Sequence, residues 1–219
     1  PVGIFSLEMS VSELTTRMLC TEAHVSMGRV RGNYSLRRDE IEALHEAGER
    51  MVSAPIYIDD GSSLTGLELR ARARRLKSKL PDLGLIVIDY LQLMHSGASR
   101  VENRQQEVSE ISRGLKTLAR ELDVPILALS QLSRQSEQRR GKDKLPRLSD
   151  LRESGAIEQD ADMVLFIHRE PNMQAGEQQD DNQPQMATLR IGKQRNGPIG
   201  DIDLLFLGQY TQFVNVKAG

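Results

Sequence analysis

Two acidic residues, Asp89 and Glu8, each follow a strand-like stretch and are the first candidates for chemistry. Asp89 comes directly after the apolar run Leu85–Ile88, and Glu8 comes after Val2–Leu7. An unbroken apolar run is typical of a strand covered on both faces of a parallel sheet, and ligands of such sheets collect at the carboxyl ends of the strands. Carboxylates at that edge suit a Mg²⁺-nucleotide site, where Asp89 holds the metal's water shell and Glu8 activates the attacking water.

Each carboxylate also has a purely structural interpretation. Asp89 can cap the segment that follows its strand, and Glu8 can stabilise the N-terminus of the next helix through the helix dipole. The two strands alone do not decide between these interpretations, so the assignment depends on other motifs of the chain.

Gln131, Lys193 and Arg195 have side chains that suit contact with phosphate. Gln131 follows the apolar stretch Pro125–Leu129, and a glutamine at a strand tip can hydrogen-bond a γ-phosphate. Lys193 and Arg195 follow a strand, and two residues spaced by two on a strand project to the same side, which suits a phosphate across an interface. A glutamine in a surface turn is equally common, so each signal is weak when read singly.

The stretch Asp150–Asp162 is the most distinctive of the chain. It places Arg152, Glu153 and Gly155 at an expected turn into a helix, where backbone N–H groups and the arginine suit a phosphodiester. It has no aromatic side chain for stacking on bases, so contact would be with the backbone of a nucleic acid. The alternative is a charged helix-turn at the surface.

The elements that position these residues alternate between strands and helices. This order, with strands closing the chain, predicts an α/β fold with a mostly parallel sheet and an antiparallel edge. Apolar runs predict that the strands ending near residues 89, 129 and 167 are buried. The expected strands are Val2–Leu7, Ile56–Asp59, Leu85–Asp89, Pro125–Leu129, Met163–Ile167, Thr188–Ile191, Ile202–Phe206 and Phe213–Val216, and the expected helices are Ser10–Cys20, Leu36–Val52, Leu69–Leu80 and Val108–Leu122.

Length and composition narrow the class of protein. The 219 residues suit one domain, and 38% hydrophobic with 27% charged residues are globular values. The net charge of −2 argues against a protein that coats a polyanion such as DNA. The aromatic content of 4% argues against a surface on which bases stack. No apolar run approaches a membrane span, and the single cysteine, Cys20, fits the cytoplasm. Because the chain starts at Pro1 inside a strand-like stretch, we expect a fragment of a longer protein.

Taken together and in this order, the motifs of this chain resemble those of the bacterial replicative DNA helicases of the DnaB family. The likeness covers essentially the whole chain, and its last two stretches are the most specific. The stretches that carry it are Phe5–Met9, Val87–Leu93, Ala128–Arg134, Asp150–Asp162 and Lys193–Gly200.

The resemblance implies that residues 1–219 form a single RecA-like P-loop NTPase motor domain, with helices on both faces of its sheet. It implies ATP and Mg²⁺ as cofactors, and a homo-hexamer that unwinds DNA in the 5′-to-3′ direction around single-stranded DNA. Primase and a helicase loader are the implied protein partners, with no membrane contact.

The family's roles transfer to matching positions of this chain. Glu8 matches the glutamate that polarises water, and Asp89 matches the Walker B aspartate on Mg²⁺. Gln131 matches the sensor of the γ-phosphate. The DNA-binding loop corresponds to Arg152, Glu153 and Gly155, and the cations that reach a neighbouring subunit's nucleotide correspond to Lys193 and Arg195, the latter as the arginine finger.

One departure from the family is the phosphate-binding loop. No G-x-x-x-x-G-K-[ST] pattern occurs in the chain. The resemblance also implies an N-terminal domain and a linker helix, which we do not expect within these 219 residues. We therefore expect the parent protein to be an ATPase and the fragment alone to be inactive.

Two other function classes fit parts of the sequence. A RecA-like recombinase or related ATPase shares the Glu8 and Asp89 pattern, and a non-enzymatic binding fragment is favoured by the absent phosphate loop. Strand displacement on a forked substrate would separate the first class from a helicase, and nucleotide titration would test the second.

Some charged segments lie outside these motifs. Six cations crowd the helix expected at Leu69–Leu80, where a solvated or subunit-contacting face is favoured over nucleic-acid binding. The basic segment Arg134–Arg147 either borders the DNA channel or is a surface loop, and 172–185 is a second expected loop. The six cations are Arg70, Arg72, Arg74, Arg75, Lys77 and Lys79.

Overall fold

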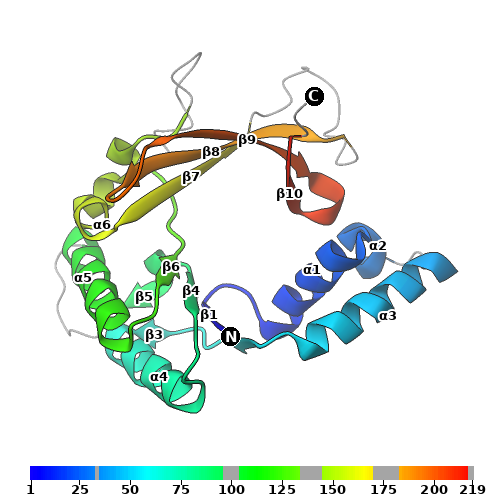
Figure 1. Cartoon of the computed structure of the whole chain (residues 1–219), viewed down its shortest axis with the longest axis horizontal. Helices are drawn as coiled ribbons and strands as arrows, with labels where there is room; N and C mark the ends of the chain where they lie inside the picture. Colours follow the sequence, from blue (N-terminus) through cyan, green and yellow to red (C-terminus); the bar gives the residue numbers. More distant parts are fainter. Residues whose placement is uncertain (33–34, 96–103, 134–144, 170–182, 217–219) are drawn as a thin grey trace. The chain divides into compact units, whose positions relative to one another are not determined.

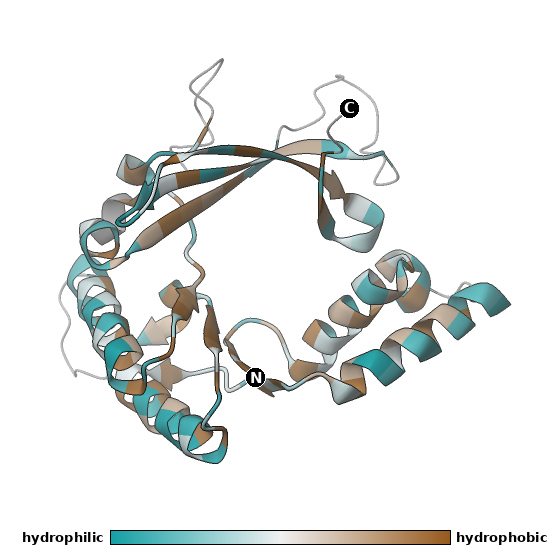
Figure 2. Ribbon diagram, in the orientation of Figure 1, coloured by the Kyte–Doolittle hydropathy of each residue, from teal (hydrophilic) through white to brown (hydrophobic). Residues whose placement is uncertain are grey.

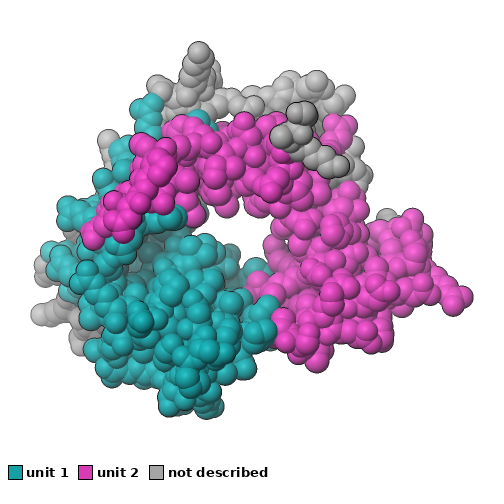
Figure 3. All heavy atoms as spheres, viewed as in Figure 1, with its two compact units in different colours: residues 1–11, 55–164 teal, residues 12–54, 165–219 magenta. Residues whose placement is uncertain are grey.

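The computed structural model describes residues 1–32, 35–95, 104–133, 145–169 and 183–216 (Figure 1), without the side chains of 152–154. The expected loops at 134–147 and 172–185 lie largely outside the described residues. The chain divides into two compact units (Figure 3): unit 1 is Pro1–Val11 with Pro55–Val164, and unit 2 is Ser12–Ala54 with Leu165–Gly219.

Unit 1 contains a four-stranded parallel sheet in the order β2-β1-β4-β6. Its strands are β1 (Val2–Ser6), β2 (Ile56–Asp59), β4 (Leu85–Asp89) and β6 (Ile126–Ala128). All four were predicted from the sequence. A two-stranded parallel sheet joins β3 (Leu64–Thr65) to β5 (Met94–His95).

Helices α4 (Gly66–Lys79) and α5 (Arg104–Leu122) confirm two predicted helices and contribute to the core of unit 1. Ile86 and Ile88 of β4 and Leu69 of α4 have no exposed surface. Both helices show apolar residues at helical spacing beside charged ones (Figure 2), so each has one buried and one solvated side. The remaining elements of unit 1 are the 3₁₀ helices η1 (Leu91–Leu93) and η4 (Leu148–Ser154) and the helix α6 (Gly155–Asp160).

Two local features fix α4 against the sheet. The Thr65 hydroxyl accepts a hydrogen bond from the Glu68 amide at 3.2 Å, and the Glu68 carboxylate accepts one from the Thr65 amide at 2.8 Å. This capping box satisfies two backbone donors that the helix start would leave unpaired. Gly3 of β1 allows a close approach, because a β carbon there would lie 2.5 Å from Leu76 Cδ2.

Unit 2 combines helices with an antiparallel sheet in the order β10-β9-β8-β7. The single cysteine, Cys20, is 2% exposed in α1, and burial raises its pKa more than nearby Arg31 lowers it. Gly192 lets the Phe166 ring pack against β8, because a β carbon at Gly192 would lie 2.5 Å from that ring. The helices are α1 (Val11–Ala23), α2 (Met27–Arg31) and α3 (Arg38–Ser53); the strands are β7 (Met163–Arg169), β8 (Gln185–Gln194), β9 (Gly200–Leu207) and β10 (Gln212–Asn215), with the 3₁₀ helix η5 (Gly208–Tyr210) before β10.

The expectation of strands buried on both faces is wrong for β7 and β6. In β7, Phe166 is 3% exposed whereas Ile167 is 56% exposed. In β6, Leu127 is 45% exposed. Successive side chains of a strand point to opposite faces, and one face of each strand is left uncovered by the described residues. The predicted antiparallel strands at the end of the chain are confirmed, and the order β10-β9-β8-β7 is that of a sheet of their own among the described residues.

None of the helices in the described part of the chain combines the length and the apolar character needed to cross a membrane.

Candidate functional site

Glu8 and Asp89 lie at the carboxyl edge of the parallel sheet of unit 1. Strands β1 and β4 are neighbours, and their register pairs Ser6 with Asp89. The Leu7 amide donates a hydrogen bond of 2.7 Å to the Asp89 carbonyl, so the pairing continues one step beyond β1. Glu8 is therefore the first residue past the paired strand, as the sequence predicted. It is exposed, whereas Asp89 is half-buried.

The two carboxylates interact electrostatically. Burial raises the pKa of Asp89, and the negative charge of Glu8 raises it further. Paired carboxylates at a sheet edge repel one another, and a divalent cation bound there would relieve that repulsion. Groups of three or more acidic, histidine or cysteine side chains suited to hold a metal do not occur among the described residues.

Ser6 fixes the turn that carries Glu8. Its side chain is 1% exposed. The hydroxyl donates to the Met9 carbonyl at 2.7 Å and accepts from the Met9 amide at 3.3 Å. A hydroxyl that makes two bonds across a three-residue turn restricts the path of that turn, and with it the direction of Glu8.

Gln131 follows β6 and is tied to the segment after β4 by Gln92. The Gln92 amide nitrogen donates to the Ser130 hydroxyl at 2.9 Å and to the Gln131 carbonyl at 3.3 Å, while the Gln131 amide donates to Gln92 Oε1 at 3.2 Å. The Gln92 backbone is held in turn, because Arg104 donates to its carbonyl at 2.7 Å. Gln131 is thus anchored through its backbone while its exposed side chain remains available.

Gln92 was not predicted from the sequence as a positioning residue. A signal was present, since Gln92 is an amide side chain in the otherwise largely apolar stretch Tyr90–Met94, three residues after Asp89. The partner of that amide could not be inferred from sequence, because the contact joins segments 38 and 39 residues apart.

The expected DNA-binding residues lie where η4 turns into α6. Arg152 and Glu153 belong to η4, and their side chains are outside the described residues. Gly155 begins α6, is exposed, and a β carbon there would meet no described protein atom within 4 Å. Internal packing of the described residues therefore does not require glycine at this position. The Ser133 amide donates to the Asp150 carbonyl at 3.2 Å, which links η4 to the segment after Gln131.

Lys193 and Arg195 belong to unit 2, whereas Glu8, Asp89 and Gln131 belong to unit 1. Lys193 is in β8, and Arg195 lies beyond its end in the turn before β9. The inference that both cations project to one side of a strand is therefore wrong, because Arg195 has no strand geometry. Lys193 is half-buried and Arg195 is exposed.

Comparison with known proteins identifies the family of the chain. The model of the DnaB-like helicase C-terminal domain matches residues 1–215. The chain belongs to this DnaB-like family. A replicative DNA helicase DnaB of Geobacillus stearothermophilus is 49% identical over 216 residues, which cover 99% of this chain and 46% of that protein. The replicative DNA helicase DnaC of Bacillus subtilis is 47% identical over 217 residues, with the same coverage.

Solved structures share the fold. A DnaB-like replicative helicase, described with its interactions with primase, gives a TM-score of 0.87 at 36% identity and covers 99% of this chain and 50% of its own. A second solved structure, of an ATPase domain, gives a TM-score of 0.86 at 35% identity and covers 99% of this chain and 74% of its own. The predicted RecA-like α/β fold and the predicted DnaB-like family are therefore confirmed. The chain spans about half the length of the curated relatives it matches.

Proposed function

We propose that this chain is the motor of a replicative DNA helicase, which couples ATP hydrolysis to 5′-to-3′ movement on single-stranded DNA and to duplex unwinding. The observation that carries the proposal is the pair of carboxylates, Glu8 and Asp89, joined at one sheet edge by the Leu7–Asp89 hydrogen bond. Membership of the DnaB-like family supports the same chemistry.

Glu8 acts as the general base and Asp89 as the residue that holds Mg²⁺ through water. The exposure of Glu8 and its turn, fixed by Ser6, suit a base that meets a bound nucleotide. The raised pKa of Asp89 is the electrostatic signature of a site that favours a cation. When bound, Mg²⁺ neutralises charge on the β- and γ-phosphates of ATP.

Gln131 contacts the γ-phosphate, and its shift when the γ-phosphate leaves is transmitted to the DNA-binding turn. The backbone hydrogen bonds to Gln92 hold the start of the segment, and the Ser133–Asp150 bond leads from it to η4. A shift of Gln131 would therefore reach the Arg152–Gly155 turn through backbone contacts.

Lys193 and Arg195 contact the nucleotide of a neighbouring subunit, with Arg195 as the arginine finger. The exposed turn that carries Arg195 suits contact outside its own subunit. This assignment requires an oligomer. We propose a homo-hexamer, which is the form that the resemblance to the DnaB family implies.

Arg152, Glu153 and Gly155 hold one DNA strand by its phosphates. An exposed glycine with open space around its α carbon lets a DNA backbone approach closely. Several such loops around one strand would gain affinity from effective concentration, so binding should depend on assembly. Primase and a helicase loader are the proposed protein partners in the cytoplasm, and residues 1–219 act as a single motor domain.

A non-enzymatic binding role is a second candidate for the chain by itself. It is favoured by the absence of a G-x-x-x-x-G-K-[ST] pattern from the 219 residues, because the phosphates of ATP would lack that cradle. Calorimetric titration of the chain with Mg²⁺-ATP tests this candidate. Weak or no binding is expected, and micromolar affinity would contradict it.

The test of the motor uses a full-length helicase that carries this sequence. ATP hydrolysis and strand displacement on a forked DNA are measured for the wild type and for Glu8→Gln. The wild type should do both, and Glu8→Gln should bind ATP but hydrolyse it about 10²-fold or more slowly and displace the strand correspondingly slowly. A wild type that hydrolyses ATP on DNA without displacing a strand would favour the recombinase-like alternative.

A further inference from the structure

The structure sorts the six cations of α4 into two groups. Arg70 and Arg74 both pair with Glu121 of α5, with 2.6 Å between Arg70 Nη2 and Glu121 Oε2. Arg72 donates to Asp59 Oδ1 at 2.7 Å, and Lys77 donates to the Leu83 carbonyl at 3.4 Å. Four of the six are therefore committed to contacts within unit 1.

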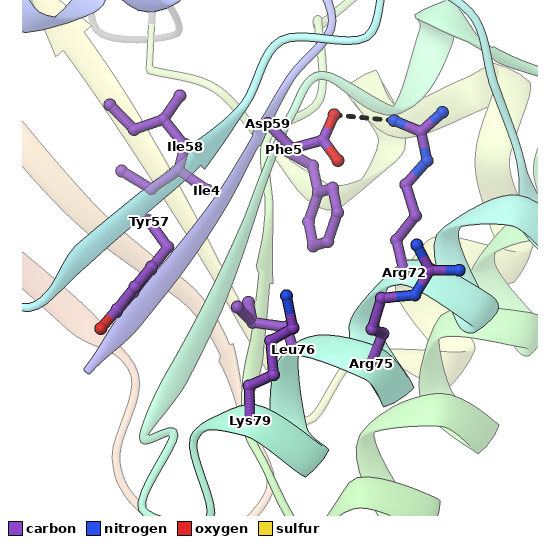
Figure 4. Close-up of a pocket in the computed structure, with 9 residues that line it drawn as sticks. All are labelled: Ile4, Phe5, Tyr57, Ile58, Asp59, Arg72, Arg75, Leu76 and Lys79. Carbon is purple, nitrogen blue, oxygen red and sulfur yellow. Dashed lines mark hydrogen bonds and ion pairs between the residues drawn. The ribbon is translucent and has the colours of Figure 1, made fainter.

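Arg75 and Lys79 are the remaining two cations, and both are exposed. Neither makes a hydrogen bond or an ion pair within the described ranges of the chain. With Arg72, they are spaced three and seven residues apart and so share one side of α4. All three line a pocket of about 230 Å³ between α4 and the strands β1 and β2 (Figure 4).

The rest of the pocket lining is largely apolar. Tyr57 and Ile58 come from β2, and Tyr57 is 43% exposed, which is high for a large aromatic side chain on a strand. Phe5 and Leu76 add apolar side chains to the lining, whereas the side chains of Ile4 and Ile58 point to the other face of the sheet. An apolar floor beside exposed cations suits a ligand that combines apolar groups with negative charge.

Among the described residues that line the pocket, the one carboxylate is already paired. Asp59 accepts from Arg72 at 2.7 Å and from the Gly61 amide at 3.2 Å. A β carbon at Gly61 would lie 2.7 Å from Arg72 Nη1, so glycine makes room for this ion pair. Three cations and one carboxylate leave the lining with a net charge of +2 (three minus one) in a chain whose net charge is −2.

We propose that this pocket is a docking site for a short acidic segment of a partner protein. Carboxylates of the segment pair with Arg75 and Lys79, and a neighbouring aliphatic side chain packs beside Tyr57. A free phosphate would leave the apolar lining unused, and a nucleic-acid backbone offers no aliphatic group for it, whereas an acidic peptide satisfies both parts of the pocket.

The docking site is separate from the proposed nucleotide site. It lies at β2, one end of the sheet order, whereas Gln131 follows β6 at the other end. Glu8, Asp89 and Gln131 do not line it. The proposal therefore goes beyond the motor function and does not depend on it.

The experiment selects binders from a displayed library of short random peptides against the 219-residue chain. The selected peptide is then labelled, and its affinity is measured by fluorescence anisotropy. We expect selected sequences to combine Asp or Glu with Leu, Ile or Phe. Replacing the carboxylates of the peptide by amides should weaken binding about tenfold, and added salt should weaken the acidic form.

The decisive variant is R75E/K79E, which should weaken peptide binding about tenfold or more. The matched control is R113E/R120E, which reverses two exposed cations of α5 and changes the net charge by the same amount. The control should bind the peptide within about twofold of the wild type. Thermal unfolding by circular dichroism checks that both double variants fold.

Three outcomes would overturn the proposal. The first is a selection without acidic enrichment, and the second is equal loss of affinity in the two double variants. The third is specific competition by inorganic phosphate or a single-stranded oligonucleotide. Either compound would then displace the peptide at an ionic strength well below the one at which sodium chloride displaces it. That result would assign the two cations to phosphate.

Discussion

The sheet edge of unit 1 and the β8–β9 hairpin of unit 2 each carry residues that we propose act on a nucleotide, and they are built differently. At the edge, Glu8, Asp89 and Gln131 come from distant parts of the sequence and are brought together by parallel pairing and by Gln92. In the hairpin, Arg195 is positioned by neighbours in sequence. Arg190 and Asp201 close that hairpin with two hydrogen bonds of 2.7 Å.

The difference between the two regions matches two different requirements, namely fixed positions at the sheet edge and contact outside the subunit at the hairpin. Long-range parallel pairing with buried polar groups holds the edge residues in fixed positions, which suits groups that must act on one water and one metal. A hairpin turn holds its cation at an exposed tip, which suits a contact made outside the subunit. Substitutions in the two regions should therefore fail in different ways.

The largest effect is expected at the hairpin. Arg195→Ala in the assembled helicase should lower ATP turnover by about 10³-fold, the value of an arginine finger in well-studied phosphoryl-transfer systems. Steady-state hydrolysis on single-stranded DNA measures it. Nucleotide binding should persist, because the edge residues are unchanged.

Subunit mixing tests whether that arginine acts in trans. Arg195→Ala subunits mixed with Glu8→Gln subunits should recover part of the activity, since some interfaces then pair an intact finger with an intact base. Native mass spectrometry establishes that the two variants co-assemble. Proven co-assembly without recovery at any ratio would show that both residues serve one subunit.

At the sheet edge, Glu8→Gln should lower turnover by about 10²-fold or more while ATP still binds. The amide keeps the shape of the side chain and removes the base. The companion variant Asp89→Asn should raise the Mg²⁺ concentration needed for half-maximal turnover. Wild-type turnover by Glu8→Gln would remove Glu8 from the reaction.

An intermediate effect is expected for Gln92→Leu. It removes the hydrogen bonds to Ser130 and to both backbone groups of Gln131, and turnover should fall about tenfold through misplacement of Gln131. The matched control Ser130→Ala removes one of these bonds and should cost about threefold at most. Equal losses for the two variants would mean that Gln92 does not position Gln131.

The smallest effect concerns stability. The raised pKa of Asp89 means that the folded chain holds this proton more tightly than the unfolded chain, so the ionised carboxylate destabilises the fold at neutral pH. Asp89→Asn should therefore raise the melting temperature by about 1–3 °C at pH 7. This gain should vanish below the ordinary pKa of 3.8 and appear as the pH rises through the raised value.

The control for this measurement is Asp82→Asn, at an exposed aspartate in the turn before β4. It should leave the melting temperature unchanged within about 1 °C at every pH. A stabilisation of the same size in both variants would show that general surface charge, and not the Asp89 site, limits stability.

The sequence predicted the strands and helices well where hydrophobic periodicity is strong. The run before Asp89 and the spacing within α5 specify β4 and α5, because burial of those residues dominates their free energy. Sequence predicted the burial of β7 poorly, since apolar residues on both faces do not reveal which face is covered.

Contacts between polar side chains were the least predictable part of the site. The cations of α4 look alike in the sequence, yet Glu121 and Asp59 pair with three of them, and no described acidic residue pairs with Arg75 or Lys79. Gln92 likewise has a role only because β6 lies beside β4. Such pairings depend on the three-dimensional path of the chain and have no local signal.

The burial of Cys20 makes the chain a convenient object for site-specific labelling. The thiol is 2% exposed and its pKa is raised, so maleimides should react with it slowly in the folded state. A cysteine introduced at an exposed position such as Ser78 could then carry a fluorophore alone. In denaturant, the rate at which the Cys20 thiol is labelled would report how fast α1 opens, without any engineered probe.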